Sequence, residues 1–181
     1  MTSLPEPGSV IARGERLLLR QLTEADAGFM LQLVNEPGWL ANIGDRGVLT
    51  LEDAVRYLRD GPLSLYPRLG FGFWAIERLD VPGPIGICGL IRRDTLPDVD
   101  IGYALLGDFE GLGYATEAAR LTLDLARVRY GLARLIAIVS PGNHASERLL
   151  AKLGMQREGM IAQGDPPEEL NLWAMSLAPA R

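Results

Sequence analysis

The feature that most constrains the fold of this chain is a glycine-rich junction between an extended segment and a helix. Residues 99–106 have the composition of a strand, and residues 116–130 carry apolar side chains at helical spacing. Between them, Gly111 and Gly113 let the backbone approach a ligand closely and point successive N–H groups at it. The start of the following helix adds a partial positive charge. The junction therefore predicts a binding site for phosphate oxygens.

A dinucleotide-binding fingerprint, G-x-G-x-x-G, fits this junction poorly. Its third glycine falls on Thr116, and the stretch around Ala133 and Arg134, about 20 residues on, offers no acid for a ribose contact. The junction also lies in the middle of the chain, whereas that fingerprint belongs to the first strand–helix unit. A tight turn without a ligand is the other alternative. The second half of the chain weighs against it.

The second half of the chain supplies another motif after one more predicted strand at residues 134–139. Asn143 and Ser146 open a predicted helix, which ends in an L-L-x-K-L-G run at residues 149–154. With the glycine-rich junction, this helix resembles the GNAT acetyltransferase superfamily, and within it the branch of ribosomal-protein N-terminal acetyltransferases. The resemblance covers residues 15–178, with the motifs in the expected order.

The junction carries the two signatures of that resemblance. Residues 110–115 match Q/R-x-x-G-x-G/A except at the first position, and residues 111–118 match the branch's G-x-G-Y-A-T-E-A run. Residues 16–26 resemble its first strand and helix start. Glu110 replaces the usual Arg or Gln, and its carboxylate would repel a pyrophosphate. We expect the Glu110 side chain to point to solvent, because the backbone donors do not depend on it.

The order of predicted elements, first a meander of strands and then strands alternating with helices, predicts a mixed sheet in one α/β domain. The resemblance implies the same GNAT-like fold, a central, mostly antiparallel sheet flanked by helices. We expect a loose tail at residues 1–14, the acetyltransferase domain at residues 15–181, and irregular backbone at 39–49 and 63–70. The predicted strands are 17–21, 71–78, 85–93, 99–106, 134–139, 156–161 and 170–177, and the predicted helices are 23–35, 50–60, 116–130 and 143–153.

The resemblance implies that acetyl-CoA is the co-substrate. Its pantetheine arm should pair with the backbone of residues 103–105 as if it were an added strand, and its pyrophosphate should meet the amides of the junction. Asn143, a predicted helix cap, should also contact the pantetheine or its linked groups. The expected cofactor-binding residues are Tyr103, Ala104, Leu105, Gly111, Leu112, Gly113, Tyr114, Ala115, Thr116, Asn143 and Ser146.

Acetyl transfer to an amine needs a base for the ammonium proton and a donor for the leaving sulfur. Ser146 matches the position assigned in related enzymes to the leaving thiolate. Many members protonate the thiolate with a tyrosine four residues later, but this chain has Leu150 there. Asp100 and Glu169 are the candidate bases, with Asp100 on the strand face opposite Ile101. Each acid could equally be a plain surface carboxylate.

The acceptor amine is left open by the sequence: a protein N-terminus, an amino acid or polyamine, or an aminoglycoside. The net charge of −5 favours a cationic acceptor. Trp39, Phe71, Phe73 and Trp74 could line the acceptor cleft, although aromatic residues in such places more often belong to the core. The alternative function, which Leu150 and the uncertain base motivate, is a catalytically silent acyl-CoA-binding or sensing module.

Composition excludes several other function classes. A net charge of −5 implies no basic face, so we expect no nucleic-acid partner. His144 and Cys88 are the single members of their residue types, so we expect neither a metal site nor an internal disulfide. No apolar run reaches membrane-spanning length. We therefore expect a cytoplasmic protein, monomer or homodimer, without a membrane partner.

Overall fold

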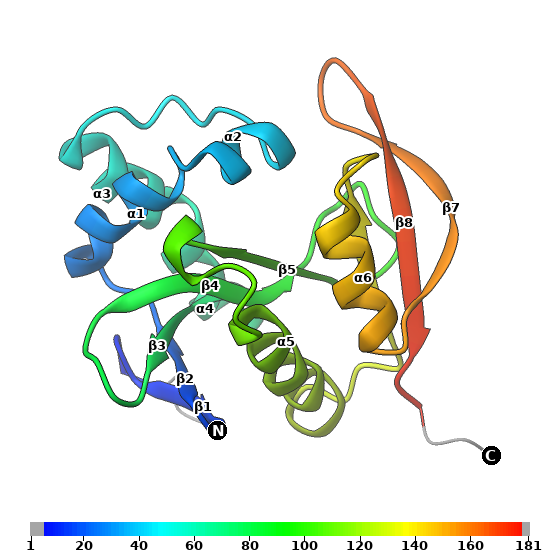
Figure 1. Cartoon of the computed structure of the whole chain (residues 1–181), viewed down its shortest axis with the longest axis horizontal. Coiled ribbons are helices and arrows are strands. Elements are labelled where there is room, and N and C mark those ends of the chain that lie inside the picture. The colour runs from blue at the N-terminus through cyan, green and yellow to red at the C-terminus, as the bar shows by residue number, and fades with distance from the viewer. Residues whose placement is uncertain (1–5, 179–181) are drawn as a thin grey trace.

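The computed structural model describes residues 6–178, which form one eight-stranded mixed sheet with helices on both faces (Figure 1). The strand order is β1-β2-β3-β4-β5-β6-β8-β7, and neighbours are antiparallel except for the parallel pair β5 and β6. The predicted α/β fold with a mostly antiparallel sheet is confirmed. The strands are β1 (Val10–Arg13), β2 (Leu17–Gln21), β3 (Phe73–Arg78), β4 (Pro84–Ile91), β5 (Asp100–Leu105), β6 (Arg134–Val139), β7 (Gln156–Gln163) and β8 (Glu168–Ser176).

The four predicted helices are present. The clearest start is that of α3, where the Thr50 hydroxyl accepts a hydrogen bond from the Asp53 amide at 3.1 Å and the Asp53 carboxylate accepts one from the Thr50 amide at 3.0 Å. A π-helical turn at Leu125–Arg129 extends α5. The α-helices are α1 (Ala27–Leu33), α2 (Pro37–Asn42), α3 (Leu51–Asp60), α4 (Pro62–Leu69), α5 (Tyr114–Asp124) and α6 (His144–Lys152).

The expectation of irregular backbone was wrong for most of α2 and for α4. Pro37 and Pro62 occupy the first positions of these helices, where the missing N–H costs nothing because that group has no intrahelical partner. Pro67 lies in the last turn of α4. Prolines therefore mark the helix starts here.

The expectation of a loose tail at residues 1–14 was wrong for β1. Val10 pairs with Arg20 of β2, and Arg13 pairs with Leu18, so the strand extends the edge of the sheet. Residues 1–5 lie outside the described part of the chain.

The helices divide between the two faces of the sheet according to strand alternation. Trp74 and Ile76 of β3 pack in the cluster that includes α5 and α6, whereas Ala75, between them, packs in the cluster of α1 and α3. Both clusters are dominated by apolar side chains that are almost fully buried. The sheet is therefore covered on both faces around β5.

The sheet is split between β5 and β6. On one side, β5 pairs with β4 from Asp100 to Leu105. On the other side, within residues 6–178, pairing is confined to Asp100 opposite Ile136, with an Ile136 amide to Val99 carbonyl bond of 3.0 Å. In the described part of the chain, the rest of the β5 edge that faces β6 has no strand partner, so the two strands diverge from this point.

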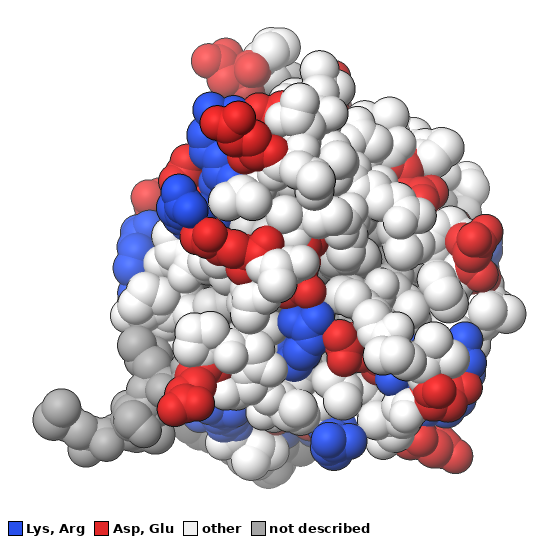
Figure 2. All heavy atoms as spheres, turned by 90° about the vertical axis from the view of Figure 1, so that its left-hand side faces the viewer, with Lys and Arg blue, Asp and Glu red and all other residues white. Residues whose placement is uncertain are grey.

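The surface over α1 and α3 carries charges of both signs. On this face, Lys and Arg side chains are interspersed with Asp and Glu around a broad uncharged area (Figure 2). None of the helices in residues 6–178 is both long enough and apolar enough to cross a membrane.

Candidate active site

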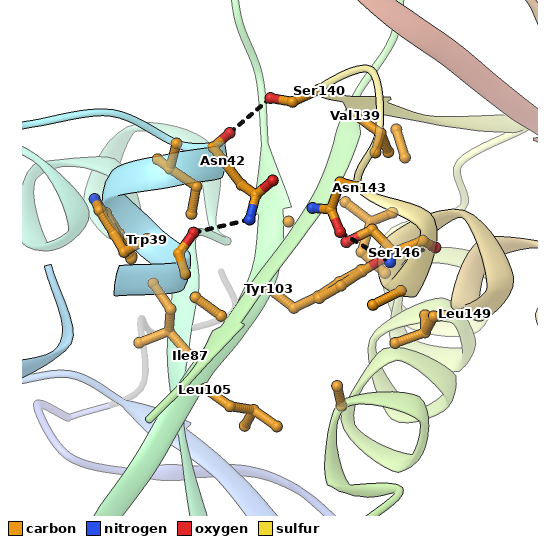
Figure 3. Close-up of a pocket in the computed structure, with 18 of the residues that line it drawn as sticks. Trp39, Asn42, Ile87, Tyr103, Leu105, Val139, Ser140, Asn143, Ser146 and Leu149 are labelled. Atoms are coloured by element: carbon orange, nitrogen blue, oxygen red, sulfur yellow. Dashed lines mark hydrogen bonds between the residues drawn. The ribbon is translucent and has the colours of Figure 1, made fainter. Parts of the chain in front are cut away.

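A cleft of about 560 Å³ opens where β5 and β6 diverge, and it passes across β5 (Figure 3). Its two sides come from different helices. The α6 half is lined by the glycine loop (residues 110–113), the start of α5, the end of β6 and α6; the α2 half is lined by α2 and the loop after it, with Tyr57, Phe73, Arg93 and Asp100. One cleft therefore joins the glycine loop to the buried carboxyl of Asp100.

The glycine loop has the backbone that its sequence predicts. Gly111 and Gly113 have φ values of +72° and +83°, in the left-handed region that favours glycine. Gly113 is the N-cap of α5, which starts at Tyr114, two residues earlier than expected. The free N–H groups of the first turn thus lie at the cleft, because Gly113, Ala115 and Thr116 all line it.

Arg16 holds the glycine loop from the adjacent sheet edge. Its guanidinium donates to the Leu112 carbonyl at 3.0 Å and to Glu117 at 2.9 Å, and its backbone amide donates to Glu117 at 2.8 Å. The same guanidinium lies 4.7 Å from the centre of the Tyr114 ring. Glu117 belongs to the G-x-G-Y-A-T-E-A run, so these contacts give that position a structural role that the sequence alone did not reveal.

Glu110 is exposed, as expected, but it also lines the cleft. A Cβ built on Gly38, at the start of α2, would lie 3.4 Å from its carboxylate. The side chain therefore lies where α2 approaches the glycine loop.

Asn143 and Ser146 meet at the start of α6. The Asn143 side-chain oxygen accepts a hydrogen bond from the Ser146 amide at 3.2 Å, so the predicted helix cap is confirmed. Both residues line the cleft (Figure 3). His144 is exposed beside Glu147, its imidazole 3.1 Å from the carboxylate.

A tyrosine from β5 lies beside Ser146. The Tyr103 side chain points toward α6, and its hydroxyl donates to the Ser146 carbonyl at 3.4 Å (Figure 3). Burial raises the pKa of Tyr103 to about 12, so the phenol keeps its proton at neutral pH. Leu150, where many relatives have their tyrosine, is 0% exposed and lies in the core. Strand alternation could have predicted the direction of Tyr103, because Ile101 and Leu105 share its face.

Asp100 lies inside the α2 half and is 1% exposed. Its carboxylate is 3.4 Å from Nε of Arg93, a long contact for an ion pair. Burial raises the pKa of Asp100 to about 6, against the lowering effect of the Arg93 charge. A buried carboxyl with this pKa can accept a proton near neutrality.

Glu169, the other candidate base, lies elsewhere. It is an exposed residue of β8, paired with Ala162 of β7, and it is not among the residues that line the cleft. The structure thus brings Asp100 and Ser146 to one cleft and leaves Glu169 outside it.

The α2 half contains two of the four aromatic residues that the sequence suggested for the acceptor cleft, together with residues that it did not single out. Trp39 and Phe73 line it, whereas Phe71 and Trp74 are core residues. Arg46, Tyr57 and Arg93 also line it, but they come from a loop, α3 and the segment after β4, with no shared motif. Sequence spacing therefore does not predict that these three residues line the same cleft.

A hydrogen bond connects the two halves across the cleft. The Ser140 hydroxyl, just after β6, donates to the Asn42 carbonyl at the end of α2 at 2.8 Å (Figure 3). The α2 segment is thereby fixed relative to the start of α6.

The sequence and fold have known relatives. Residues 16–156 match the family described as an acetyltransferase (GNAT) domain. "Uncharacterized N-acetyltransferase YoaA" of Bacillus subtilis is 29% identical over 156 residues, which cover 84% of this chain and 86% of YoaA. "Uncharacterized N-acetyltransferase p20" of Bacillus licheniformis is 29% identical over 151 residues, covering 81% of this chain and 83% of p20.

Solved structures share the whole fold. A GNAT-family acetyltransferase from Bacillus anthracis has a TM-score of 0.76 at 24% identity, covering 93% of this chain and 99% of that one. RimL, a ribosomal L7/L12 alpha-N-protein acetyltransferase solved with coenzyme A, has a TM-score of 0.79 at 19% identity, covering 93% and 98%. At these identities the structures support the fold. Since the family match spans most of the chain, from just before β2 to the first residue of β7, this protein belongs to the GNAT acetyltransferase family.

Proposed function

We propose that this acetyltransferase moves an acetyl group from acetyl-CoA to a primary amine by direct attack within a ternary complex. The observation that carries the proposal is the continuous cleft, which connects the glycine loop to Asp100 through the split in the sheet. A donor held in the α6 half and an amine in the α2 half would meet at β5. Holding both reactants in this way supplies the proximity that bimolecular transfer needs.

The α6 half fits acetyl-CoA, which supplies an activated acyl group as a thioester. Among the described residues, Tyr103, Ala104 and Leu105 have no strand partner on the β5 edge that faces β6, so this edge offers backbone groups to the pantetheine amides. The amides of Gly111, Leu112, Gly113, Tyr114, Ala115 and Thr116 suit the pyrophosphate. Arg148 and Lys152 line the same half and add positive charge for phosphate groups.

Asp100 is the general base in this proposal. With a pKa of about 6 it is mostly ionised at neutral pH, and it remains basic enough to take a proton from an ammonium group. The α-amino group of a peptide N-terminus has a pKa of about 7.7–8.0, so the pKa difference between such an acceptor and Asp100 is small. The position of Glu169 outside the cleft leaves it without a role in this step.

Ser146 and Tyr103 are the hydroxyl donors on the α6 side of β5. In the proposal, the Ser146 hydroxyl donates to the leaving sulfur. The Tyr103 hydroxyl, which already contacts the Ser146 carbonyl, fixes that segment of α6. In the proposal, Ser146 thus protonates the thiolate in place of the tyrosine that many relatives have at the position of Leu150.

The acceptor is a protein N-terminus or a small amine. RimL acts on a ribosomal protein N-terminus, and another neighbour, from Vibrio fischeri, is a ribosomal-protein-S5-alanine acetyltransferase. Their likeness supports an α-amino acceptor. The buried, unpaired thiol of Cys88 suits the cytoplasm, where we place the protein.

The test has two arms. Calorimetry should detect acetyl-CoA binding, and mass spectrometry should detect acetylated products after incubation with a panel of amines and peptides. Failure to bind acetyl-CoA at millimolar concentration would refute the proposal. Tight binding without turnover across the panel would favour the silent acyl-CoA-binding module instead.

A further inference from the structure

We infer that the acceptor is a free α-amino acid with an apolar side chain, whose carboxylate binds Arg46 and Arg93. The inference rests on the proposed function and specifies its acceptor. The α2 half contains two arginines and one aspartate, so it has an excess of positive charge, whereas the whole chain has a net charge of −5.

Two guanidinium groups lie in the α2 half. Arg46 comes from the loop between α2 and α3, and Arg93 follows β4. Burial raises the pKa of Tyr57, and the charges of Arg46 and Arg93 both oppose that rise, so both lie near this phenol. The acid beside Arg93 is Asp100. Glu110, the other acid lining the cleft, lies near Gly38 at the start of α2, whereas Arg46 follows the end of that helix.

These two arginines keep hydrogen-bonding capacity for a ligand. Within residues 6–178, Arg46 forms no ion pair, and Arg93 reaches Asp100 through Nε at 3.4 Å, with 41% of its side chain exposed. By contrast, the Arg20 guanidinium is shared between Asp26 at 2.7 Å and Glu77 at 2.8 Å. The terminal nitrogens of Arg46 and Arg93 can therefore bind a carboxylate, which guanidinium groups bind in a planar, two-bonded geometry.

An α-amino acid matches this arrangement of charges. Its ammonium group can approach the Asp100 carboxylate while its carboxylate, two bonds away, meets the adjacent Arg93. A purely cationic acceptor would instead meet two positive charges. Trp39, Phe73 and Ile87 line the same half and suit an apolar side chain.

The acceptor test compares leucine, methionine and phenylalanine with their amides, each with acetyl-CoA as the donor. Turnover is measured as the release of the free thiol of CoA and as formation of the acetylated product. The amide keeps the side chain and removes the carboxylate. Its amine also carries the lower pKa, because the carboxylate stabilises the ammonium form, so intrinsic reactivity favours the amide at neutral pH. We expect kcat/KM for the acids to exceed that for the amides at least tenfold.

A residue test uses Arg46→Gln, with Arg127→Gln as the matched control. Arg127 is an exposed residue of the π-helical turn and is not among those lining the cleft. We expect Arg46→Gln to lower kcat/KM for the preferred acid at least tenfold, to leave its amide within twofold, and to leave acetyl-CoA affinity unchanged. Arg46→Lys should recover part of the loss, because it retains the charge.

The outcomes separate the two proposals. Equal or better turnover of amides or short peptides would overturn the amino-acid inference and leave the acetyltransferase proposal standing. An equal loss for acid and amide in Arg46→Gln would make Arg46 a structural residue and would also overturn the inference. If acetyl-CoA does not bind, the proposed function fails and the inference fails with it.

Discussion

The α6 half of the cleft offers backbone groups as well as side chains, whereas the α2 half offers side chains. In the α6 half, the left-handed glycines, the first turn of α5 and the free edge of β5 present N–H and C=O groups. In the α2 half, the polar side chains include Asp100, Arg93, Arg46 and Tyr57, which come from separate elements.

This difference explains why one half is visible in the sequence and the other is not. A backbone site needs particular backbone conformations, and those require glycines at fixed spacing, which leave a motif. A side-chain site needs only that residues meet in space. The α6 half therefore carries the motifs that mark the family, and in our proposal the α2 half binds the acceptor. The four predictions below test this division.

The largest effect is expected from Asp100→Asn in the α2 half. The variant keeps the shape of the side chain and removes the base, so we expect kcat to fall about 10³-fold at neutral pH. The rise of the wild-type rate through pH about 6 should disappear, because it reflects ionisation of Asp100. A pH–rate profile with one amine throughout measures both changes, since the pKa of the amine also shapes it. Glu169→Gln is the matched control and should leave the profile intact.

Stability separates this role from a structural one. The folded pKa of Asp100, about 6, lies above the unfolded value of about 3.9, so the wild-type protein loses stability as pH rises through this window. Asp100→Asn removes the cost of the buried charge. It should match or exceed the wild type in free energy of unfolding above pH 6, by up to about 3 kcal/mol. A variant that is inactive because it unfolds would contradict the assignment.

Ser146→Ala tests the chemistry of the α6 half. Loss of a positioned proton donor should lower kcat about 10²-fold and change acetyl-CoA affinity much less. Single-turnover kinetics and calorimetry measure the two quantities separately. A change in kcat of less than threefold would return Ser146 to the status of a structural helix residue.

Gly113→Val tests the backbone character of the α6 half. Valine is strained at a φ of +83°, and a Cβ at Gly113 would lie 3.2 Å from a guanidinium nitrogen of Arg16, so the substitution should distort the loop. We expect acetyl-CoA affinity to fall at least tenfold, about 1.4 kcal/mol, while the protein stays folded. Gly131→Val is the control, because Gly131 has a φ of +61° and lies outside the cleft. If both variants bind acetyl-CoA as the wild type does, the loop does not belong to the site.

The smallest effect is expected from Arg16→Met, which leaves the glycine loop unaltered in sequence. It removes the contacts to Leu112 and Glu117 that hold the loop. We expect acetyl-CoA affinity to fall about threefold, within the usual range for partly exposed ion pairs, with no change in KM for the amine. Arg59→Met, which breaks the exposed pair with Glu24, is the control. An effect on the amine alone would show that the two halves are not independent.

The sequence predicted those parts of the molecule that depend on local patterns. The strand at Arg134–Val139 and the helix at Leu51–Asp60 were found because apolar periodicity and a capping box mark them. α4 was missed because Pro62 and Pro67 resemble breakers, although the first residue of a helix tolerates proline. Sequence could not choose between Asp100 and Glu169, because the choice depends on burial. The sequence also could not predict that Arg46 and Arg93 line the same cleft, because only tertiary packing places them there.

The split between β5 and β6 should also make the stability of the folded protein depend on the concentration of acetyl-CoA. A sheet interrupted in its interior lacks hydrogen bonds that a strand-like ligand can form, so acetyl-CoA bound there would complete the sheet. A ligand at a hundred times its Kd stabilises the native state by about 2.7 kcal/mol, and each kcal/mol raises the Tm of a domain of this size by about 2–4 °C. The resistance of this protein to heat and to proteolysis should therefore rise and fall with the cellular concentration of acetyl-CoA.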